Sequence, residues 1–98
     1  MSSYNPSPID TSNIALSDDI KAIAEQLAKN THENWALQRM KEGWTFGQKR
    51  DDILKQTPVM LPYEELSESE KEYDRITSLE TLKTIIALGY DVKKGLGA

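Results

Sequence analysis

The chain has 98 residues, of which 38% are hydrophobic and 29% are charged, a balance typical of one small soluble domain. Its formal net charge of −4 argues against nucleic acid as the main partner, because binding to phosphates depends on Lys and Arg. It contains no cysteine, which excludes disulfides and thiolate metal sites.

The first segment, residues 1–16, is rich in Ser, Asn and Pro. Pro6 and Pro8 favour an extended backbone, so we expect an extended arm that packs on the domain. Residues 17–92 are predicted to form the domain core. Residues 93–98 are predicted to form a flexible tail.

A first long helix is predicted from Ser17, a suitable N-cap, to Gly43, a suitable stop, with a length of about 25 residues. An apolar stripe follows helical spacing along its first part. Its members are Ile20, Ile23, Ala24, Leu27, Thr31 and Trp35. Leu37 and Met40 fall on the opposite side, so the next segment or a partner chain must cover them.

The connection over residues 44–62 is irregular. Trp44 and Phe46 alternate with polar residues, as in a short strand, and the prolines at positions 58 and 62 exclude a continuous helix. We expect residues 44–47 to pair with a second short strand at residues 90–92.

A second long helix is predicted from the capping box at residues 67–70 to Gly89. Its apolar stripe is Ile76, Leu79, Leu82 and Ile86. A second capping pattern at residues 77–80 leaves a break near Thr77 as an alternative. The predicted fold is therefore mainly α, with two long antiparallel helices, an irregular proline-containing connection and a short two-stranded antiparallel β element.

No nucleophile elbow, P-loop or dinucleotide-binding motif occurs in the sequence, so we expect neither an enzyme nor a cofactor. The single histidine, His32, has no partner at metal-ligand spacing, because position 36 is Ala, and we expect no metal site. Asp51, Asp52 and Asp74 lie beside Arg50 and Arg75. Such carboxylates are more typical of salt bridges and caps than of an acid pair in catalysis.

A polar-aromatic set is the best candidate for a binding site. His32, Trp35 and Arg39 share one flank of the first helix, because they are spaced three and four residues apart. Trp44, Arg50 and Tyr63 follow along the chain. Trp and Arg stack on flat rings, and Arg binds anions in a forked geometry, so these six residues are predicted to bind a ligand. The alternative is that both tryptophans are core residues and that His32 is structural.

The motifs resemble those of a known family. They begin with Tyr4–Pro8 and Asp10–Ser12, continue through His32–Arg39, Gly43–Gly47 and Arg50–Asp52, and end with Pro62–Tyr63, Tyr73–Arg75, Glu80–Lys83 and Leu88–Tyr90. In order and content they are similar to the RyR domain, the repeat of ryanodine receptor calcium channels, over roughly residues 4–92. In the channels the repeats form tandem pairs outside the pore. The domain also occurs as a short stand-alone protein in bacteria and phages, which this chain resembles.

The resemblance implies a non-catalytic binding module. A lone repeat is expected to pair with itself as a homodimer, or with another RyR-type repeat, and to sense a nucleotide-like small ligand at the paired interface. The alternative is a protein-interaction or structural module without a small ligand. No signal peptide and no apolar run of membrane-spanning length is visible, so we expect a cytoplasmic protein with no membrane partner.

Overall fold

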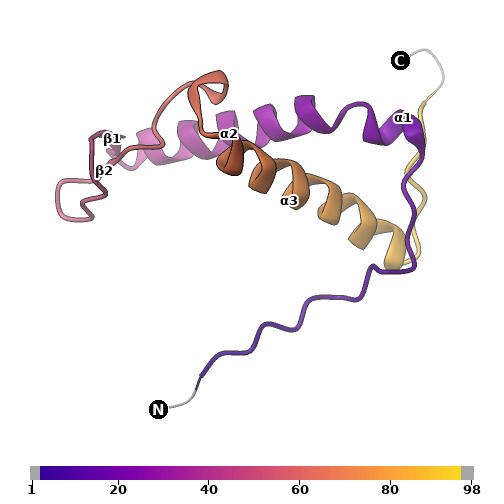
Figure 1. Cartoon of the computed structure of the whole chain (residues 1–98). Coiled ribbons are helices and arrows are strands. Elements are labelled where there is room, and N and C mark those ends of the chain that lie inside the picture. The colour runs from indigo at the N-terminus through magenta and orange to yellow at the C-terminus, as the bar shows by residue number, and fades with distance from the viewer. Residues whose placement is uncertain (1–2, 96–98) are drawn as a thin grey trace.

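The computed structural model describes residues 3–95. Its helices are α1 (Asp18–Lys21), α2 (Ala24–Lys41), the 3-10 turn η1 (Tyr63–Glu65) and α3 (Glu68–Ala87). Its strands are β1 (Thr45–Phe46) and β2 (Gln56–Thr57). The long helices α2 and α3 run in opposite directions and form a wedge that is closed near the start of α3 and open towards its end (Figure 1). The prediction of a mainly helical fold with two long antiparallel helices is confirmed.

Small residues allow α2 and α3 to approach each other. Ala28 of α2 is completely buried, and Ser78 of α3 is buried as well. The Ser78 hydroxyl lies 3.0 Å from the Thr31 hydroxyl of α2 and donates to the backbone carbonyl of Asp74 at 2.8 Å. Because these hydrogen bonds satisfy the hydroxyls of Thr31 and Ser78, burying them between α2 and α3 costs little desolvation energy.

The ends of the helices follow the local sequence. The hydroxyl of Ser17 accepts from the amide of Ile20, and that of Ser67 accepts from the amide of Glu70. Gly43 ends α2 with φ of +96°, where residues with a Cβ are strained. The amides of Gly43 and Trp44 bond back to the carbonyls of Met40 and Arg39, the Schellman pattern that satisfies the last carbonyls of a helix.

The first helix is interrupted, which corrects the prediction of one helix of about 25 residues. The backbone of Ile23 has φ −98° and ψ 9°, and its amide bonds to the carbonyl of Ile20 instead of continuing the α pattern. No Gly or Pro lies between residues 17 and 41 to indicate this break. In contrast, α3 is continuous, so the alternative break near Thr77 is wrong.

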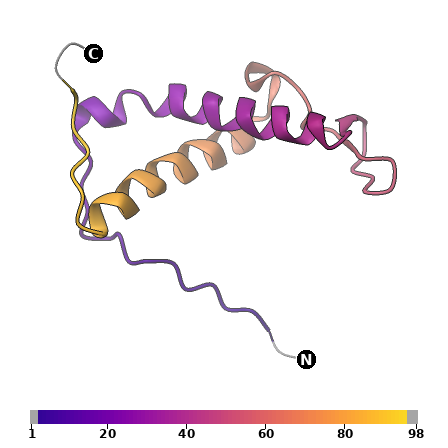
Figure 2. The same ribbon diagram turned by 180° about the vertical axis from the view of Figure 1, so that it is seen from behind.

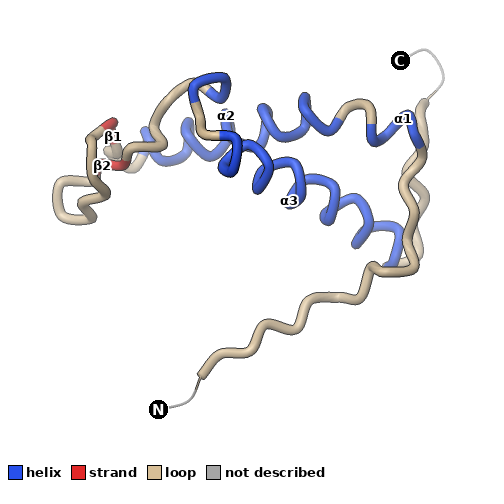
Figure 3. Tube along the Cα trace, viewed as in Figure 1, coloured by secondary structure: helices blue, strands red, loops and turns tan. Residues whose placement is uncertain are grey.

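The β element is parallel, not antiparallel, and its second strand is β2 rather than residues 90–92 (Figure 3). The reason is a double reversal of the chain. After β1 the backbone turns back, and Asp51 forms an antiparallel bridge with Gln56. A second turn, with Lys55 at φ 55°, then returns the chain in its first direction. Gln56 therefore pairs with Asp51 on one side and with Thr45 on the other.

The core lies at the closed end of the wedge. Ala28, Tyr63 and Leu66 form its buried cluster, and Val59 and Leu61 of the connection pack against it. Ile76, predicted to belong to the apolar stripe of the second helix, is 56% exposed because no other segment of residues 3–95 covers that side of α3. Leu37 and Met40 are 54% and 56% exposed, so the connection leaves them uncovered.

The N-terminal arm leaves the helices at the open end of the wedge (Figures 1 and 2). Residues 3–10 are exposed, while the Thr11 hydroxyl donates to Glu80 of α3 at 2.7 Å and Leu16 is buried. The boundaries 1–16, 17–92 and 93–98 stay a prediction, and residues 96–98 of the predicted tail lie outside the described residues. Among residues 3–95, none of the helices has the length and apolar character needed to cross a membrane.

Candidate functional site

His32 is held inside the molecule. It lies on α2 with 5% of its surface exposed, and its Nε2 is 2.6 Å from the carbonyl oxygen of Leu61. The imidazole also stacks on Trp35, one turn later, with ring centroids 5.5 Å apart and an interplanar angle of 24°. His32 therefore fixes the orientation of Trp35 and anchors the connection, and this role leaves little of it accessible to a ligand.

Tyr63 is buried and belongs to a second set of interacting polar residues. Its hydroxyl donates to Glu25 of α2, and Glu25 also pairs with Arg75 of α3 at 2.8 Å. Arg75 reaches Glu68 at 3.0 Å, so one guanidinium links α2 to the start of α3. Burial, together with the hydrogen bond to Glu25, raises the pKa of Tyr63 to about 12. The hydrogen bond from Arg75, followed by that from Tyr63, lowers the pKa of Glu25 below its ordinary value. These residues join the two long helices.

The remaining predicted residues meet at the end of α2. Trp44 is 8% exposed, and two guanidinium groups lie over its ring, that of Arg39 at 5.6 Å and that of Arg50 at 5.2 Å from the ring centroid. This is cation–π geometry on a desolvated indole. Arg39 also pairs with Glu42, and Arg50 with Asp52, both at 2.9 Å. Because both ion pairs are exposed, each contributes little to stability, and an incoming anion can compete for the guanidinium groups.

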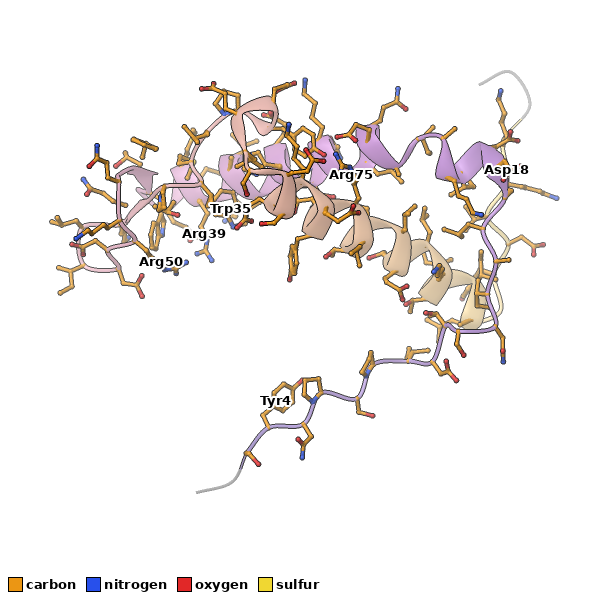
Figure 4. All side chains as sticks on the ribbon, viewed as in Figure 1. Tyr4, Asp18, Trp35, Arg39, Arg50 and Arg75 are labelled. Carbon is orange, nitrogen blue, oxygen red and sulfur yellow. The ribbon has the colours of Figure 1, made fainter. Side chains whose placement is uncertain are left out.

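The six predicted residues thus form two groups. The first group, His32, Trp35 and Tyr63, lies at the closed end of the wedge, where the ring centroids of His32 and Tyr63 are 6.3 Å apart. The second group, Arg39, Trp44 and Arg50, is called the arginine stack below. Trp35 and Arg39 are one helical turn apart on α2 and therefore connect the groups. Figure 4 shows Trp35, Arg39 and Arg50 in succession towards the β1–β2 end, with Arg75 farther along the wedge.

Sequence reasoning missed the Glu25–Arg75 pair, which is separated by 50 residues. No local pattern brings such distant charges together. The carboxylates that it considered have different roles: Asp51 accepts from the amides of Ile53 and Leu54 in a turn, and Asp52 pairs with Arg50. Asp74, in contrast, takes part in none of the ion pairs of residues 3–95, which corrects the expectation of a salt bridge there.

Hollows adjoin both sides of His32. The one on the α3 side has a volume of about 290 Å³ and includes Trp35, Tyr73 and Asp74 in its wall. The other, of about 240 Å³, is bordered by Met40, Met60 and Pro62. Within the described part of the chain, acidic and histidine side chains do not gather in a group of three that would hold a metal ion.

Fold and site together define a small two-helix domain, closed by a proline-containing connection that is anchored on His32. The family model of the RyR domain matches residues 4–94, nearly the whole chain. The chain belongs to the RyR domain family, as the ordered motifs predicted.

Proposed function

We propose that this protein is a non-catalytic, cytoplasmic binding module that works as one member of a pair of RyR-type repeats, the second member being another copy of the chain. The uncovered apolar surface is the observation that carries this proposal. Leu37 and Met40 stand more than half exposed on α2, and Phe46 of β1 is 51% exposed. Exposed apolar side chains on neighbouring elements are typical of surfaces that pair.

The shape of the chain supports pairing. The Cα radius of gyration is 16.5 Å, whereas a compact domain of roughly 100 residues has about 13 Å. No large side chain is fully buried in residues 3–95, so one copy alone has a thin core. A twofold pair would cover the same surface on both copies.

Pairing can be tested by sedimentation equilibrium of the intact chain. We expect a dimer, weakened at least tenfold by the double substitution Leu37→Glu/Met40→Glu. The matched control is Leu88→Glu/Tyr90→Glu, which adds the same charge at comparably exposed apolar positions just after α3. A monomer at every accessible concentration, or equal weakening by both variants, would contradict the proposal.

At the finer level, the module is proposed to sense a nucleotide-like ligand at the paired interface. The Arg39–Trp44–Arg50 stack supports this, because it presents two guanidinium groups that can bind phosphates in forked geometry. Trp35 is partly exposed one turn before Arg39 and is suited to stack on a base.

The ligand proposal is tested by thermal unfolding with a panel of adenine nucleotides at millimolar concentration. A bound nucleotide stabilises the folded state by mass action, so the melting temperature should rise. Trp35→Ala and Arg39→Ala/Arg50→Ala should abolish the rise. Lys41→Ala/Lys49→Ala, which removes two exposed cations outside the stack, should leave it intact. No shift with any nucleotide would refute nucleotide sensing.

The second candidate is a protein-interaction module without a small ligand. The ion pairs that already occupy Arg39 and Arg50 favour it, because each guanidinium has a carboxylate partner within the chain. A stable dimer whose melting temperature does not respond to nucleotides would support this alternative.

A further inference from the structure

The hollow beside Trp35 differs in character from the arginine stack. Its wall comes from α2, the connection and one face of α3, and none of Arg39, Trp44 and Arg50 belongs to it. It is lined by Thr31, His32, Trp35, Val59, Leu66, Glu70, Tyr73, Asp74 and Thr77. Its volume of about 290 Å³ is at the lower end of small-molecule sites. The wall includes two carboxylates and neither Lys nor Arg, so phosphates are disfavoured there.

The two carboxylates have no Lys or Arg partner within the described part of the chain. Glu70 and Asp74 are one turn apart on α3, so they lie on the same face, and neither takes part in an ion pair of residues 3–95. Asp74 is partly buried, and desolvation raises its pKa above the ordinary value. An isolated carboxylate at such a position is destabilised, and a bound cation relieves that cost.

The cations nearest in sequence have other partners. Lys71 lies over the ring of Tyr63 at 5.8 Å, and Arg75 is held by Glu25 and Glu68. Neither Lys71 nor Arg75 belongs to the wall of the hollow. In the wall itself His32 is the one basic side chain, and its charge interaction with Asp74 partly opposes the effect of desolvation on the pKa of that carboxyl.

Aromatic rings complete the wall. Trp35 is fixed by its stacking on His32, which is itself held by the Leu61 carbonyl. Tyr73 lies on the carboxylate-bearing face of α3 and is 68% exposed, so it forms part of the outer wall. Aromatic faces attract organic cations, most strongly where water is partly excluded.

We propose that this hollow is a binding site for a primary alkylammonium group, whose charge is met by Glu70 and Asp74 and whose alkyl chain lies against Trp35, Val59 and Leu66. The site shares Trp35 with the proposed nucleotide contacts, but none of Arg39, Trp44 and Arg50 belongs to its wall. An ammonium group of this kind can belong to a small free amine or to a lysine side chain of a protein, and both present the same chemistry to the hollow.

The test is a titration of the intact chain, followed by ¹H–¹⁵N NMR, with n-butylammonium chloride. We expect saturable shifts at the indole N–H of Trp35 and at the amides of residues 70–77. The uncharged isostere n-butanol and the anion n-butyrate should bind at least tenfold more weakly. Equal binding of n-butanol, or shifts that do not saturate, would overturn the proposal. This first test needs only the unmodified chain.

Substitutions then locate the site. Glu70→Gln and Asp74→Asn, each alone and together, should weaken n-butylammonium binding, and the double variant should do so at least tenfold. Glu42→Gln/Asp52→Asn makes the same change of net charge at the arginine stack and should not alter binding. Equal weakening by both double variants would mean general electrostatic attraction and would overturn the assignment.

A second probe identifies the source of the ammonium group. N-acetyl-lysine N-methylamide carries the same alkylammonium on a peptide unit. If it binds as well as n-butylammonium, the site accepts lysine side chains. If only n-butylammonium binds, the ligand is a small amine. Binding of neither probe would overturn the proposal, whereas the nucleotide and dimer experiments would be unaffected.

Discussion

The imidazole Nε2 of His32 donates a hydrogen bond to the backbone carbonyl of Leu61 over a distance of 2.6 Å. A carbonyl only accepts, so this nitrogen carries a proton. The bond joins α2 to the proline-containing connection across 29 positions of sequence. The burial and the backbone hydrogen bond support the structural interpretation of this histidine, while its predicted role in ligand binding stays a prediction.

Replacing His32 by Phe should destabilise the fold. The ring volume is kept, but the buried carbonyl of Leu61 loses its donor, and we expect a loss of about 1–3 kcal/mol in the free energy of unfolding. Urea denaturation measures it. Asn34→Ala, at an exposed position on the same helix, is the control and should change stability by less than about 0.5 kcal/mol. An unchanged urea midpoint for His32→Phe would contradict the assigned role.

Tyr63 should make stability depend on pH in the alkaline range. Burial and the bond to Glu25 raise the pKa of Tyr63 from 10.0 to about 12 in the folded state. Because the folded pKa lies above the unfolded one, this contribution is fully present below pH 10 and is lost between pH 10 and about 12. Urea midpoints measured across this window should fall more steeply for the native chain than for Tyr63→Phe. Parallel slopes for the two proteins would show that the Tyr63 hydroxyl is not coupled to folding.

Gly47 should be required for the pairing of β1 and β2. A Cβ at this position would lie 2.6 Å from the Cβ of Gln56, closer than van der Waals contact allows. The Gly47 amide donates to the Thr57 carbonyl at 3.2 Å, so the strands cannot separate without losing a hydrogen bond. We expect Gly47→Ala to cost about 1–3 kcal/mol in thermal or urea unfolding. Gly95→Ala, with open space around its Cβ, should have almost no effect, and equal stability of the two variants would refute the close contact.

The two tryptophans should differ in their access to solvent. Trp44 is 8% exposed and close to two arginines, whereas Trp35 is only partly buried at the edge of the hollow. Acrylamide should therefore quench the fluorescence of Trp44→Phe, in which Trp35 emits, more strongly than that of Trp35→Phe. The opposite order would mean that the arginine stack does not cover Trp44 in solution.

Local chemistry made much of the helical part of the fold predictable. Ser17 and Ser67 cap helices because their hydroxyls satisfy free amides, and Gly43 and Gly89 end them because only glycine adopts a positive φ without strain. The ordered motifs predicted the RyR family, which the family model confirmed. The break at Ile23 could not be predicted, because no residue with a special backbone preference stands there.

The sequence predicted which residues belong to the candidate site, but it did not predict which of them contact one another. Sequence spacing placed Trp35 and Arg39 on one flank of a helix. Only the tertiary structure showed that the turn between β1 and Asp51 brings Arg50 to the same indole as Arg39. The sequence did not predict the hollow with Glu70 and Asp74, because Trp35, which completes its wall, lies on another helix.

The sequence by itself determined the helical segments and most of their ends, since caps and helical spacing depend on neighbouring residues, and its ordered motifs determined the family. The tertiary structure decided the direction of the β pairing, the burial of His32 and Tyr63, and the separation of an arginine stack from an acidic hollow. These features depend on contacts between segments tens of residues apart, and the free energy of such contacts is set by packing and desolvation, which local sequence does not encode.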